Sequence, residues 1–367
     1  MMPKAKHEIP TPALVIDMDA MEGNIARMAA WFRRHREAGG RAQLRPHVKA
    51  HKTPILAHKQ LAVGEAVGIT CAKLGEALVM SEAGIRDILI ANQIVDRQKI
   101  YTLAGLARHA RLTVALDTEK NAKDLARACR QAGAELGVLV EVDVGLHRCG
   151  LRKADEAVRL AKKVSRMKGL AFRGLQGFEG HLVFVRNARE RRRRVRADLA
   201  ILAETQKALE QAGLPVEIVS GGSTGTYDVA AESGILDEVQ AGSYLFMDTN
   251  YRKARRDFDP ALRLLTTLVS IPDRHTIIVD CGLKSLTSDE GSVPLIEGLH
   301  TTEPIELHEE HAIIRVRRIP SGFRVGNRLS ILPGHVCTTV NLHDRYYGLR
   351  DDRVEVIWPI AARGRFD

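Results

Sequence analysis

Residues 136–142 have the sequence LGVLVEV, an apolar run that passes directly into the polar stretch DVGLHRCG at 143–150. A short continuous apolar run of this kind is typical of a strand that is buried on both faces. Seven further runs recur, each followed by a helical pattern or a turn, near 43–48, 68–71, 87–91, 112–116, 172–177, 216–220 and 236–240. Eight such repeats in about 200 residues predict an α/β fold, a closed (β/α)8 TIM barrel rather than an open doubly wound sheet.

The pattern of helix-forming and strand-forming residues changes after Asp248. The chain becomes rich in β-forming residues, with few helical repeats between them, at 264–271, 276–279, 311–316 and 328–332. This pattern predicts a second, mostly antiparallel β domain. We therefore expect a barrel domain at 14–248 and a β domain at 249–367, with residues 1–13 as an optional part of the latter. The apolar stretch 13–16 fits a strand of the β domain or a lid over the barrel.

The composition is that of a globular protein. Of 367 residues, 45% are hydrophobic and 27% are charged, which allows one large core and a smaller one. No apolar signal segment precedes Thr11, and no apolar run approaches the roughly 20 residues that a membrane helix needs. The cysteines are odd in number and scattered, at Cys71, Cys129, Cys149, Cys281 and Cys337. We expect a soluble, cytoplasmic protein with no membrane partner.

The net charge of +10 raises the question of a nucleic-acid partner. The densest basic run, RERRRR at 189–194, opens a helical pattern in which Val195, Leu199, Leu202 and Leu209 recur at helical spacing. We interpret this run as a solvated helix face. Aromatic residues make up only 4% of the chain and none lies among these arginines, so the run offers no stacking surface for bases. We expect no nucleic-acid partner, whereas a basic rim would favour small anionic ligands.

The first apolar run leads into LRPHVKAHKTP, residues 44–54, which places two lysines where a strand ends and a helix begins. Catalytic groups of α/β barrels gather at such strand ends. A lysine on a desolvated rim with cationic neighbours can lose its proton well below the free value of about 10.4 and attack an aldehyde as a neutral amine. Lys49 and Lys52 are both candidates for this Schiff-base chemistry, and a solvated basic loop explains these residues equally well.

Polar side chains also follow the fifth and sixth runs. The fifth ends in EVDVGLHRCG at 141–150, which includes Arg148, and the sixth ends in LQGFEGH at 175–181, which includes Gln176 and His181. Loops after barrel strands are polar in any case, so each stretch alone is a weak signal. Together they favour an enzyme over a structural protein.

Glycine-rich stretches after the last two runs predict a phosphate site. The seventh run ends in SGGSTGT at 220–226 and leads into a helical pattern, so backbone N–H groups and hydroxyls would meet at a helix N-terminus. Gly242-Ser243-Tyr244 follows the eighth run. Barrels commonly bind phosphate after strands seven and eight. A plain glycine turn is the alternative.

A histidine and a cysteine lie two residues apart after a predicted strand, in PGHVC at 333–337. On an extended chain, His335 and Cys337 would point the same way, so both could bind one metal ion. Two ligands do not complete a site, and a free cysteine is more often a core residue. With water and substrate in the other positions, however, such a site would be open and catalytic.

Taken together, these motifs resemble the fold-type III pyridoxal 5'-phosphate (PLP) enzymes of the D-threonine aldolase and D-serine dehydratase family, which have an alanine racemase-like barrel. The resemblance covers nearly the whole chain, through the stretches TPALV (11–15), RPHVK (45–49), KLGEA (73–77), GGSTGT (221–226), GSY (242–244), PGHVC (333–337) and WPIAARG (358–364). It implies that Lys49, which follows the Arg-Pro-His-Val step, forms the Schiff base with PLP, and that Lys52 is a neighbour.

The resemblance also implies roles for the other candidates. Arg148 lies where related enzymes place an arginine near the phenolic oxygen of PLP, and Gln176 is a further cofactor neighbour. His181 is a candidate base or a partner of metal-bound water, and His335 and Cys337 match the metal pair. The phosphate-binding positions are matched by Gly222, Ser223, Thr224, Gly242, Ser243 and Tyr244. Because the β domain of this family contributes to active sites near a dimer interface, we expect a homodimer.

The same residues can serve two reactions of a D-3-hydroxy amino acid, because PLP accepts electrons from either the Cα–Cβ or the Cα–H bond. A D-threonine aldolase breaks the first and releases glycine and an aldehyde. A D-serine or D-3-hydroxyaspartate dehydratase breaks the second and releases a keto acid and ammonia. The stretches 242–248 and 358–364 look aldolase-like, whereas the His-x-Cys pair is similar to the zinc site of D-serine dehydratases. We expect a lyase, with the aldolase reaction ahead of the dehydratase reaction.

The family resemblance also bears on the identity of the metal and on two other possible functions. A thiolate ligand shifts the preference toward Zn²⁺ over Mn²⁺ or Mg²⁺, so we expect zinc or manganese, with magnesium as a further option. An amino-acid racemase is less well supported, because racemisation needs no Lewis acid at Cβ. A non-catalytic PLP-binding protein is also less well supported, since the single-domain barrels of that kind lack a β domain.

Overall fold

The computed structural model describes residues 3–367, apart from the side chain of Glu290. The chain packs into two compact units. The barrel unit consists of Met28–Lys49, Pro54–Gly242 and Arg365–Asp367, and the β unit consists of the chain up to Arg27, Ala50–Thr53 and Ser243–Gly364. The chain therefore passes from one unit to the other more than once, and one of these passages comes directly after Lys49.

The barrel unit is built on eight parallel strands in the spatial order β2-β9-β8-β7-β6-β5-β4-β3. They are β2 (Gln43–Leu44), β3 (Ile69–Cys71), β4 (Asp87–Ile90), β5 (Arg111–Leu116), β6 (Leu136–Glu141), β7 (Leu170–Gly177), β8 (Ile218–Gly221) and β9 (Glu238–Val239). Parallel bridges from Leu44 to Ala66 and from His47 to Thr70 join the two ends of this order and close the ring. The strands coincide with the eight apolar runs, which confirms the predicted (β/α)8 barrel.

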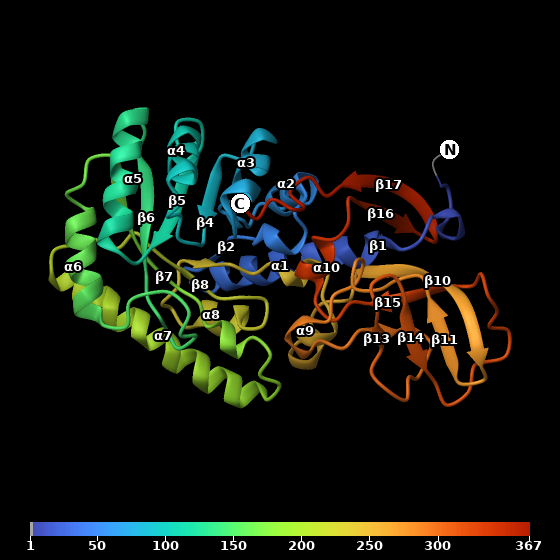
Figure 1. Ribbon diagram of the computed structural model, residues 1–367. Helices are drawn as coiled ribbons and strands as arrows, with labels where there is room; N and C mark the ends of the chain where they lie inside the picture. Colours follow the sequence, from blue (N-terminus) through green and yellow to red (C-terminus); the bar gives the residue numbers. More distant parts are fainter. Residues whose placement is uncertain (1–2) are drawn as a thin grey trace. The chain divides into compact units, whose positions relative to one another are not determined.

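Helices alternate with these strands, and Figure 1 shows α3 to α7 around the outside of the barrel strands. They are α2 (Pro54–Ala62), α3 (Leu74–Glu82), α4 (Arg97–Leu106), α5 (Glu119–Ala132), α6 (Ala154–Val164), α7 (Ala188–Gln211) and α8 (Tyr227–Glu232). A further long helix, α1 (Met18–Glu37), begins in the β unit and ends in the barrel unit. Within the described residues, no helix is both long and apolar enough to cross a membrane.

Helix α5 illustrates how local sequence sets these elements. The Thr118 hydroxyl accepts a hydrogen bond from the Asn121 N–H and caps the first turn. Leu125 and Cys129 lie one turn apart and are fully buried, which places one apolar stripe in the core. Gly133 ends the helix with φ +63°, a conformation that glycine adopts without steric cost.

The arginine-rich run at the start of α7 is mostly a solvated helix face, as predicted. Arg193 is exposed and ion-paired with Glu190 in the same helix, while the four apolar residues predicted to face inward are fully buried: Val195, Leu199, Leu202 and Leu209. Arg191 departs from the prediction. Its side chain is buried and donates to the Val185 carbonyl at 2.6 Å, so this arginine holds the loop before the helix.

The β unit contains a nine-stranded, mostly antiparallel sheet, which confirms the second predicted domain type. Its strands are β1 (Ala13–Asp17), β10 (Leu262–Asp273), β11 (Thr276–Val279), β12 (Leu295–Ile296), β13 (Glu306–Leu307), β14 (Ala312–Arg315), β15 (Arg328–Leu332), β16 (Arg345–Arg350) and β17 (Arg353–Pro359). The predicted β-rich stretches correspond to β10, β11, β14 and β15. The hairpin of β16 and β17 was not among them; its turn places Asp351 and Asp352 at positive φ.

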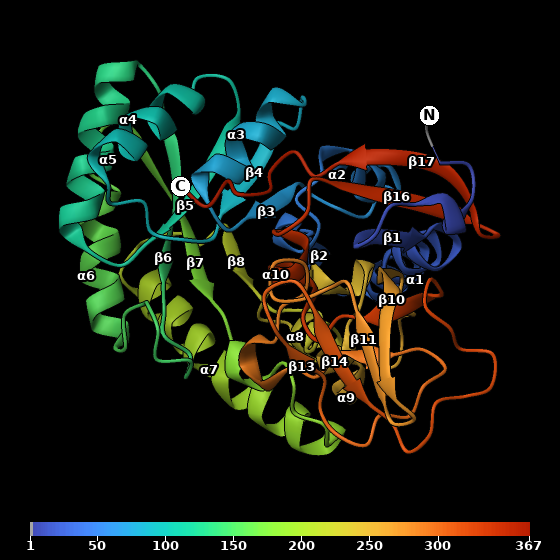
Figure 2. The same ribbon diagram turned by 45° about the vertical axis from the view of Figure 1, so that its right-hand side comes forward.

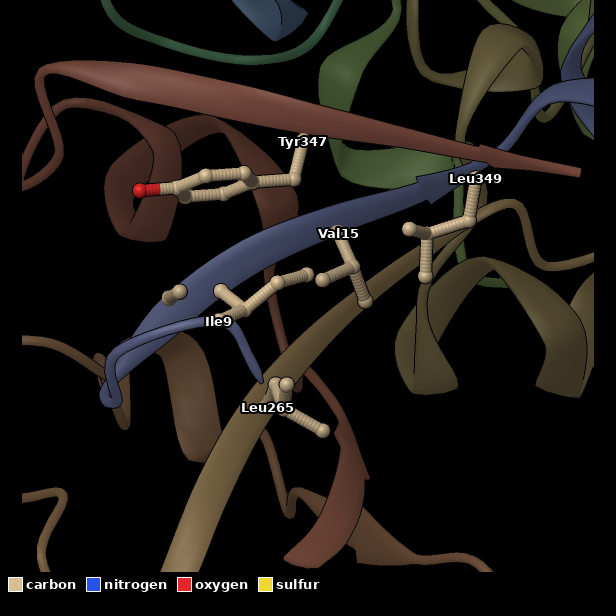
Figure 3. Packing of buried hydrophobic residues seen from close by; sticks show 6 residues of the cluster. Ile9, Val15, Leu265, Tyr347 and Leu349 are labelled. Atoms are coloured by element: carbon tan, nitrogen blue, oxygen red, sulfur yellow. The ribbon is translucent and has the colours of Figure 1, made fainter. Parts of the chain in front are cut away.

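The apolar stretch near the start of the chain is a strand of this sheet and not a lid. β1 pairs antiparallel with β10 and parallel with β16, and Figure 2 shows it between β10 and the β16–β17 hairpin. Figure 3 shows the core that this pairing creates, with Ile9, Val15, Leu265, Tyr347 and Leu349 packed together. Packing therefore groups residues 14–27 with the β unit. The domain ranges 14–248 and 249–367 remain predictions from the sequence.

Candidate active site

Lys49 lies in the barrel unit, in the 3-10 helix η2 (Val48–Ala50) that follows β2. Its Nζ atom lies 5.8 Å from the centroid of the Phe178 ring, and Cζ of Arg148 lies 5.7 Å from the same centroid. Phe178 follows β7, and Arg148 is in the loop after β6. One aromatic ring at the carboxyl end of the barrel strands therefore contacts both cationic side chains that the sequence indicated.

Arg45, in the same motif as Lys49, supports the strand end from within the barrel. Its buried guanidinium donates to the two carboxylate oxygens of Glu238 at 2.6 and 2.8 Å and to Asp87 at 2.9 Å. Burial lowers the pKa of Arg45, yet these carboxylates raise it above its ordinary value. Lys52 belongs to the β unit, where it is buried at φ +54°. The two candidate lysines therefore lie in different surroundings.

Two acidic residues lie at the end of β6 and in the loop that follows it, the loop that also contains Arg148. Burial alone would raise the pKa of Asp143, but hydrogen bonds from the side chain and N–H of His147 and from the Gly145 N–H lower it to about 2. Asp143 therefore organises this loop as a carboxylate. Glu141, at the end of β6, is also buried; burial raises its pKa, although a hydrogen bond from a neighbouring glutamine and the charge of Arg148 act in the opposite direction.

Gln176 lies near the end of β7 and faces its neighbouring strands. Its Oε1 accepts a hydrogen bond from Gln240 Nε2 at 3.2 Å, and the same nitrogen lies 2.9 Å from the Ser220 hydroxyl. All three side chains are almost completely buried. Gln176 is therefore part of a polar network that spans β7, β8 and the end of β9 inside the barrel.

His181 lies in the short helix η3 (Gly180–Leu182), just beyond Phe178. Its Nε2 atom lies 3.0 Å from Oδ2 of Asp198, which is on α7. Burial raises the pKa of Asp198, whereas the neighbouring His181 and Arg194 act to lower it. The structure therefore places a carboxylic side chain that the sequence did not indicate beside the candidate base.

The glycine-rich loop after β8 is held by the buried side chain of Glu179. The Thr226 hydroxyl donates to Glu179 Oε1 at 2.5 Å, and the Gly222 N–H lies 3.3 Å from Oε2. Burial raises the pKa of Glu179, although these hydrogen bonds act to lower it. Within the loop, the Ser223 N–H donates to the Thr226 hydroxyl and the Gly225 N–H to the Ser223 hydroxyl. The loop is therefore preformed by contacts within the protein.

Glycine is required in this region for close backbone approach. Gly222 has φ +73°, and a Cβ atom at Gly225 would lie 2.3 Å from the Val183 carbonyl oxygen. A Cβ atom at Gly242 would likewise lie 2.4 Å from the His47 carbonyl oxygen. Small residues, hydroxyls and backbone amides gathered in this way fit the chemistry of a phosphate group. Thr224, in the same loop, is also buried.

Ser243 and Tyr244 begin the β unit, directly after Gly242. Both lie in the short helix η4 (Ser243–Leu245) and are buried, and the Tyr244 ring packs on Phe258 with centroids 5.6 Å apart. The Ser243 carbonyl accepts a hydrogen bond from the Met247 N–H at 2.8 Å, which fixes this turn. The chain therefore passes from the barrel unit to the β unit at the peptide bond between Gly242 and Ser243, within the predicted phosphate-binding residues.

The candidate metal pair lies in the β unit, but the argument from an extended chain is wrong. Only His335 has extended backbone; Cys337 is in the first turn of helix α10 (Val336–Val340), which His335 precedes as the N-cap. The two side chains still meet. Burial lowers the pKa of His335, but hydrogen bonds and charge from Cys337 and from Asp289 raise it to about 10. His335 Nδ1 lies 2.6 Å from Asp289 Oδ2.

Two carboxylates hold the backbone and side chains around this pair. The Thr338 hydroxyl donates to the second oxygen of Asp289 at 2.8 Å, and the Val336 N–H donates to Asp248 at 3.1 Å. Burial raises the pKa of Asp248 to about 6, against hydrogen bonds from its neighbours. An imidazole and a cysteine sulfur are ligands that suit zinc. Among the described residues, no group of three or more histidine, cysteine and acidic side chains could hold a metal ion.

The barrel and the β sheet define an alanine racemase-like fold, and comparison with known proteins assigns the family. Residues 16–250 match the alanine racemase N-terminal domain, and residues 261–349 match a family model of a serine dehydratase domain. The chain belongs to the family of the alanine racemase N-terminal domain. This family implies PLP as the cofactor.

Individual relatives narrow the resemblance. D-threonine aldolase of Arthrobacter sp is 40% identical over 360 residues, which cover 97% of this chain and 93% of the relative. 3-hydroxy-D-aspartate aldolase of Paracoccus denitrificans (strain Pd 1222) is 36% identical over 368 residues, covering 98% and 93%. The crystal structure of D-threonine aldolase from Filomicrobium marinum superposes with a TM-score of 0.95 at 37% identity, covering 100% of this chain and 99% of the other. The similarity therefore spans both units.

Several residues of the site escaped the sequence analysis. Phe178 and Glu179 stood within a quoted stretch, yet nothing in the local pattern distinguished them from ordinary loop residues. Asp198 is on a helix face and Asp289 begins the short 3-10 helix η5 (Asp289–Gly291), so neither has a local sequence signal. Only the fold brings Asp198 beside His181 and Asp289 beside the candidate metal pair.

Proposed function

We propose that this protein is a PLP-dependent lyase of the D-threonine aldolase type, which cleaves D-3-hydroxy amino acids to glycine and an aldehyde. The observation that carries the proposal is the position of Lys49 and Arg148 against one aromatic ring at the carboxyl ends of the barrel strands. The full-length similarity to two aldolases supports the choice of reaction.

In this proposal, Lys49 holds PLP covalently and Arg148 lies near its phenolic oxygen. When bound, PLP accepts the electron pair that is released at Cα of the amino acid. Gln176 would be a further neighbour of the cofactor. The phosphate group is held by the glycine-rich loop and by the turn that follows β9, through Gly222, Ser223, Thr224, Gly242, Ser243 and Tyr244. The loop contacts with Glu179 support this role, because a preformed cradle loses little entropy when the ligand binds.

His181 acts in this proposal as the general base that takes the proton of the substrate's β-hydroxyl. A histidine is suited to this task because its imidazole exchanges protons near neutral pH. His335 and Cys337 would hold a divalent metal, Zn²⁺ or Mn²⁺ with Mg²⁺ as a further option, and the metal would polarise the β-hydroxyl as a Lewis acid. We further propose that the enzyme works as a homodimer in the cytoplasm.

The second candidate is a dehydratase that acts on D-serine or D-3-hydroxyaspartate. Two observations favour it: the match of residues 261–349 to a serine dehydratase domain, and the His335-x-Cys337 pair that resembles the zinc site of D-serine dehydratases. In that reaction Lys49 would remove the α-proton and the metal would assist the departure of the β-hydroxyl. A racemase and a non-catalytic PLP-binding protein have less support, because neither needs the His335 and Cys337 pair.

The reaction is tested by incubating the purified protein with PLP, with Zn²⁺ or Mn²⁺, and with D-threonine and D-serine in separate reactions. Glycine with acetaldehyde supports the aldolase, and a keto acid with ammonia supports the dehydratase. Lys49→Ala should abolish the absorption band of the bound cofactor, whereas Lys207→Ala, at an exposed position of α7, should retain it. An unchanged spectrum in Lys49→Ala would overturn the assignment of the lysine.

A further inference from the structure

The pair formed by His181 and Asp198 has a geometry that goes beyond the assignment of His181 as a base. Nε2 of His181 lies 3.0 Å from Oδ2 of Asp198, and the two side chains are 26% and 18% exposed. Oδ2 is itself buried and accepts no hydrogen bond within the described residues, so its contact with Nε2 is an ion-pair contact. A buried carboxylate oxygen with one nitrogen within reach has one effective way to be stabilised, which is by that nitrogen.

The backbone at Gly145 also lies close to the imidazole ring. Gly145 has φ +118°, and a Cβ atom placed there would lie 3.1 Å from Cε1 of His181 and 3.7 Å from the second oxygen of Asp198. The loop after β6 therefore runs close to the imidazole, while α7 presents the carboxylate to it. The close approach of Gly145 and Asp198 to the same ring limits the orientations that it can adopt.

The charged groups around the pair come from two elements. Arg194, four residues before Asp198 on α7, acts on the carboxylate with a favourable charge. Glu179, which precedes η3, interacts with Asp198 as a like-charged neighbour. Burial raises the pKa of Glu179, and Asp198 is the carboxyl group whose Oδ2 lies 3.0 Å from Nε2 of the imidazole.

We propose that Asp198 is a positioning residue for the β-hydroxyl deprotonation, and that it acts through His181. The inference rests on the proposed function. The carboxylate lies at ion-pair distance from Nε2 and so favours a positive charge on the ring, while Nδ1 makes no hydrogen bond within the described residues. Nδ1 is therefore the atom that receives the proton, and Asp198 stabilises the imidazolium that results.

The proton and electron balance of the step is complete. The O–H bond of the β-hydroxyl breaks as an N–H bond forms at Nδ1, and the oxygen's electron pair becomes the second bond of the aldehyde. The Cα–Cβ bond breaks and leaves its pair at Cα, where the bound cofactor can accept it. One proton then returns to Cα, so glycine and the aldehyde together contain the atoms of the substrate.

The experiment compares Asp198→Asn with wild type in two reactions of the PLP-loaded enzyme. Cleavage of D-threonine needs the β-hydroxyl proton to be removed, whereas exchange of the glycine α-proton in D2O needs the cofactor and Lys49 but no β-hydroxyl. We expect kcat for cleavage to fall about 100-fold, within the usual range for general-base catalysis, with KM and the glycine exchange rate within about twofold of wild type. Glu204→Gln, at an exposed position on the same helix, is the matched control and should change neither reaction.

The outcomes separate this inference from the function on which it rests. Without glycine exchange in wild type, the PLP assignment itself fails. If His181→Ala retains cleavage, the base assignment fails, and if His181→Ala loses cleavage while Asp198→Asn retains it, only the role of Asp198 is overturned. An equal loss of cleavage and exchange in Asp198→Asn means a merely structural role and also overturns the proposal. If Asp198→Asn does not fold, the same two reactions are measured in Asp198→Ala and in Gly145→Ala. An unchanged kcat for cleavage in either folded variant counts against the proposal.

Discussion

Replacement of Glu179 tests the idea that a buried carboxyl group preforms the glycine-rich loop after β8. The side chain has no exposed surface and accepts hydrogen bonds from the Thr226 hydroxyl and the Gly222 N–H. In Glu179→Ala both donors lose their acceptor inside the barrel. A buried donor without a partner costs about 1–3 kcal/mol, so we expect the free energy of unfolding to fall by about 2–5 kcal/mol.

Glu179→Gln separates the shape of the side chain from its ionisation. The amide keeps one acceptor oxygen but presents an NH2 group to one of the two donors, so we expect a smaller loss of about 1–3 kcal/mol. Burial raises the pKa of Glu179, which means that the folded state binds the proton more tightly than the unfolded state. The corresponding stabilisation is fully present below the unfolded pKa and is lost as the pH rises through the raised folded pKa. The glutamine variant should lack this pH-dependent term.

The measurements are urea unfolding at a series of pH values and titration of the apoprotein with PLP, followed by absorbance. A loop that must be ordered by the ligand binds it more weakly, and we expect Glu179→Ala to lose about tenfold in PLP affinity, which corresponds to about 1.4 kcal/mol. Glu204→Gln, on the exposed face of α7, is the control for a change of charge alone. The reasoning is refuted if Glu179→Ala unfolds with the wild-type free energy and binds PLP with unchanged affinity.

Three other substitutions test the metal pair, the glycine-rich loop and the core. Asp289→Asn should weaken Zn²⁺ binding about 10- to 100-fold, because Asp289 orients the imidazole of His335; competition with a chromophoric chelator measures this, and unchanged affinity would contradict it. Gly225→Ala forces Cβ to within 2.3 Å of a carbonyl oxygen and should lower the free energy of unfolding by about 1–3 kcal/mol. Gly105→Ala, in open space on α4, should raise the same free energy by up to about 1 kcal/mol. Equal effects of the two substitutions in urea unfolding would refute the steric argument. Leu199→Ala removes a fully buried side chain and should lower the same free energy by about 2–5 kcal/mol, and a change below about 1 kcal/mol would show that this helix face is not tightly packed.

The barrel strands were predictable because each strand has its own continuous run of apolar residues in the sequence. A buried parallel strand must be apolar on both faces, so runs such as 136–142 differ sharply from the helices and loops around them. Strand β1 was less predictable. Its apolar residues fit a lid or a strand equally well, and the choice depended on pairing with β10 and β16, which lie far away in the sequence.

The candidate site divides in the same way. Lys49, Arg148 and His181 stand in polar stretches directly after predicted strands, where barrel geometry gathers functional groups. Their partners were not predictable, because Asp198 lies on a helix among other charged residues and Glu179 lies in an ordinary polar loop. Such residues become significant only through the groups that they contact.

His335 and Cys337 lie close together, but for another local reason than the sequence argument assumed. The sequence pattern indicated an extended chain, in which residues i and i+2 share a face, but Cys337 lies in the first turn of α10. His335 keeps extended backbone as the N-cap, and the turn of the helix that follows brings the two side chains into contact. A short helix after a strand is set by capping and by tertiary contacts such as that from Asp248, which apolar periodicity does not reveal.

The sequence by itself determined the order of the βα repeats, the strand ends that bear chemistry and the family to which the motifs belong. These features depend on consecutive residues, because burial imposes a period on the chain and glycines mark close backbone approach. Only the tertiary structure decided that residues 13–17 join the β sheet, that Lys49 and Lys52 lie in separate compact units, and that Asp198 faces His181. Those outcomes depend on which distant segments pack together. A local pattern of apolar and polar residues does not specify the distant segment against which it packs.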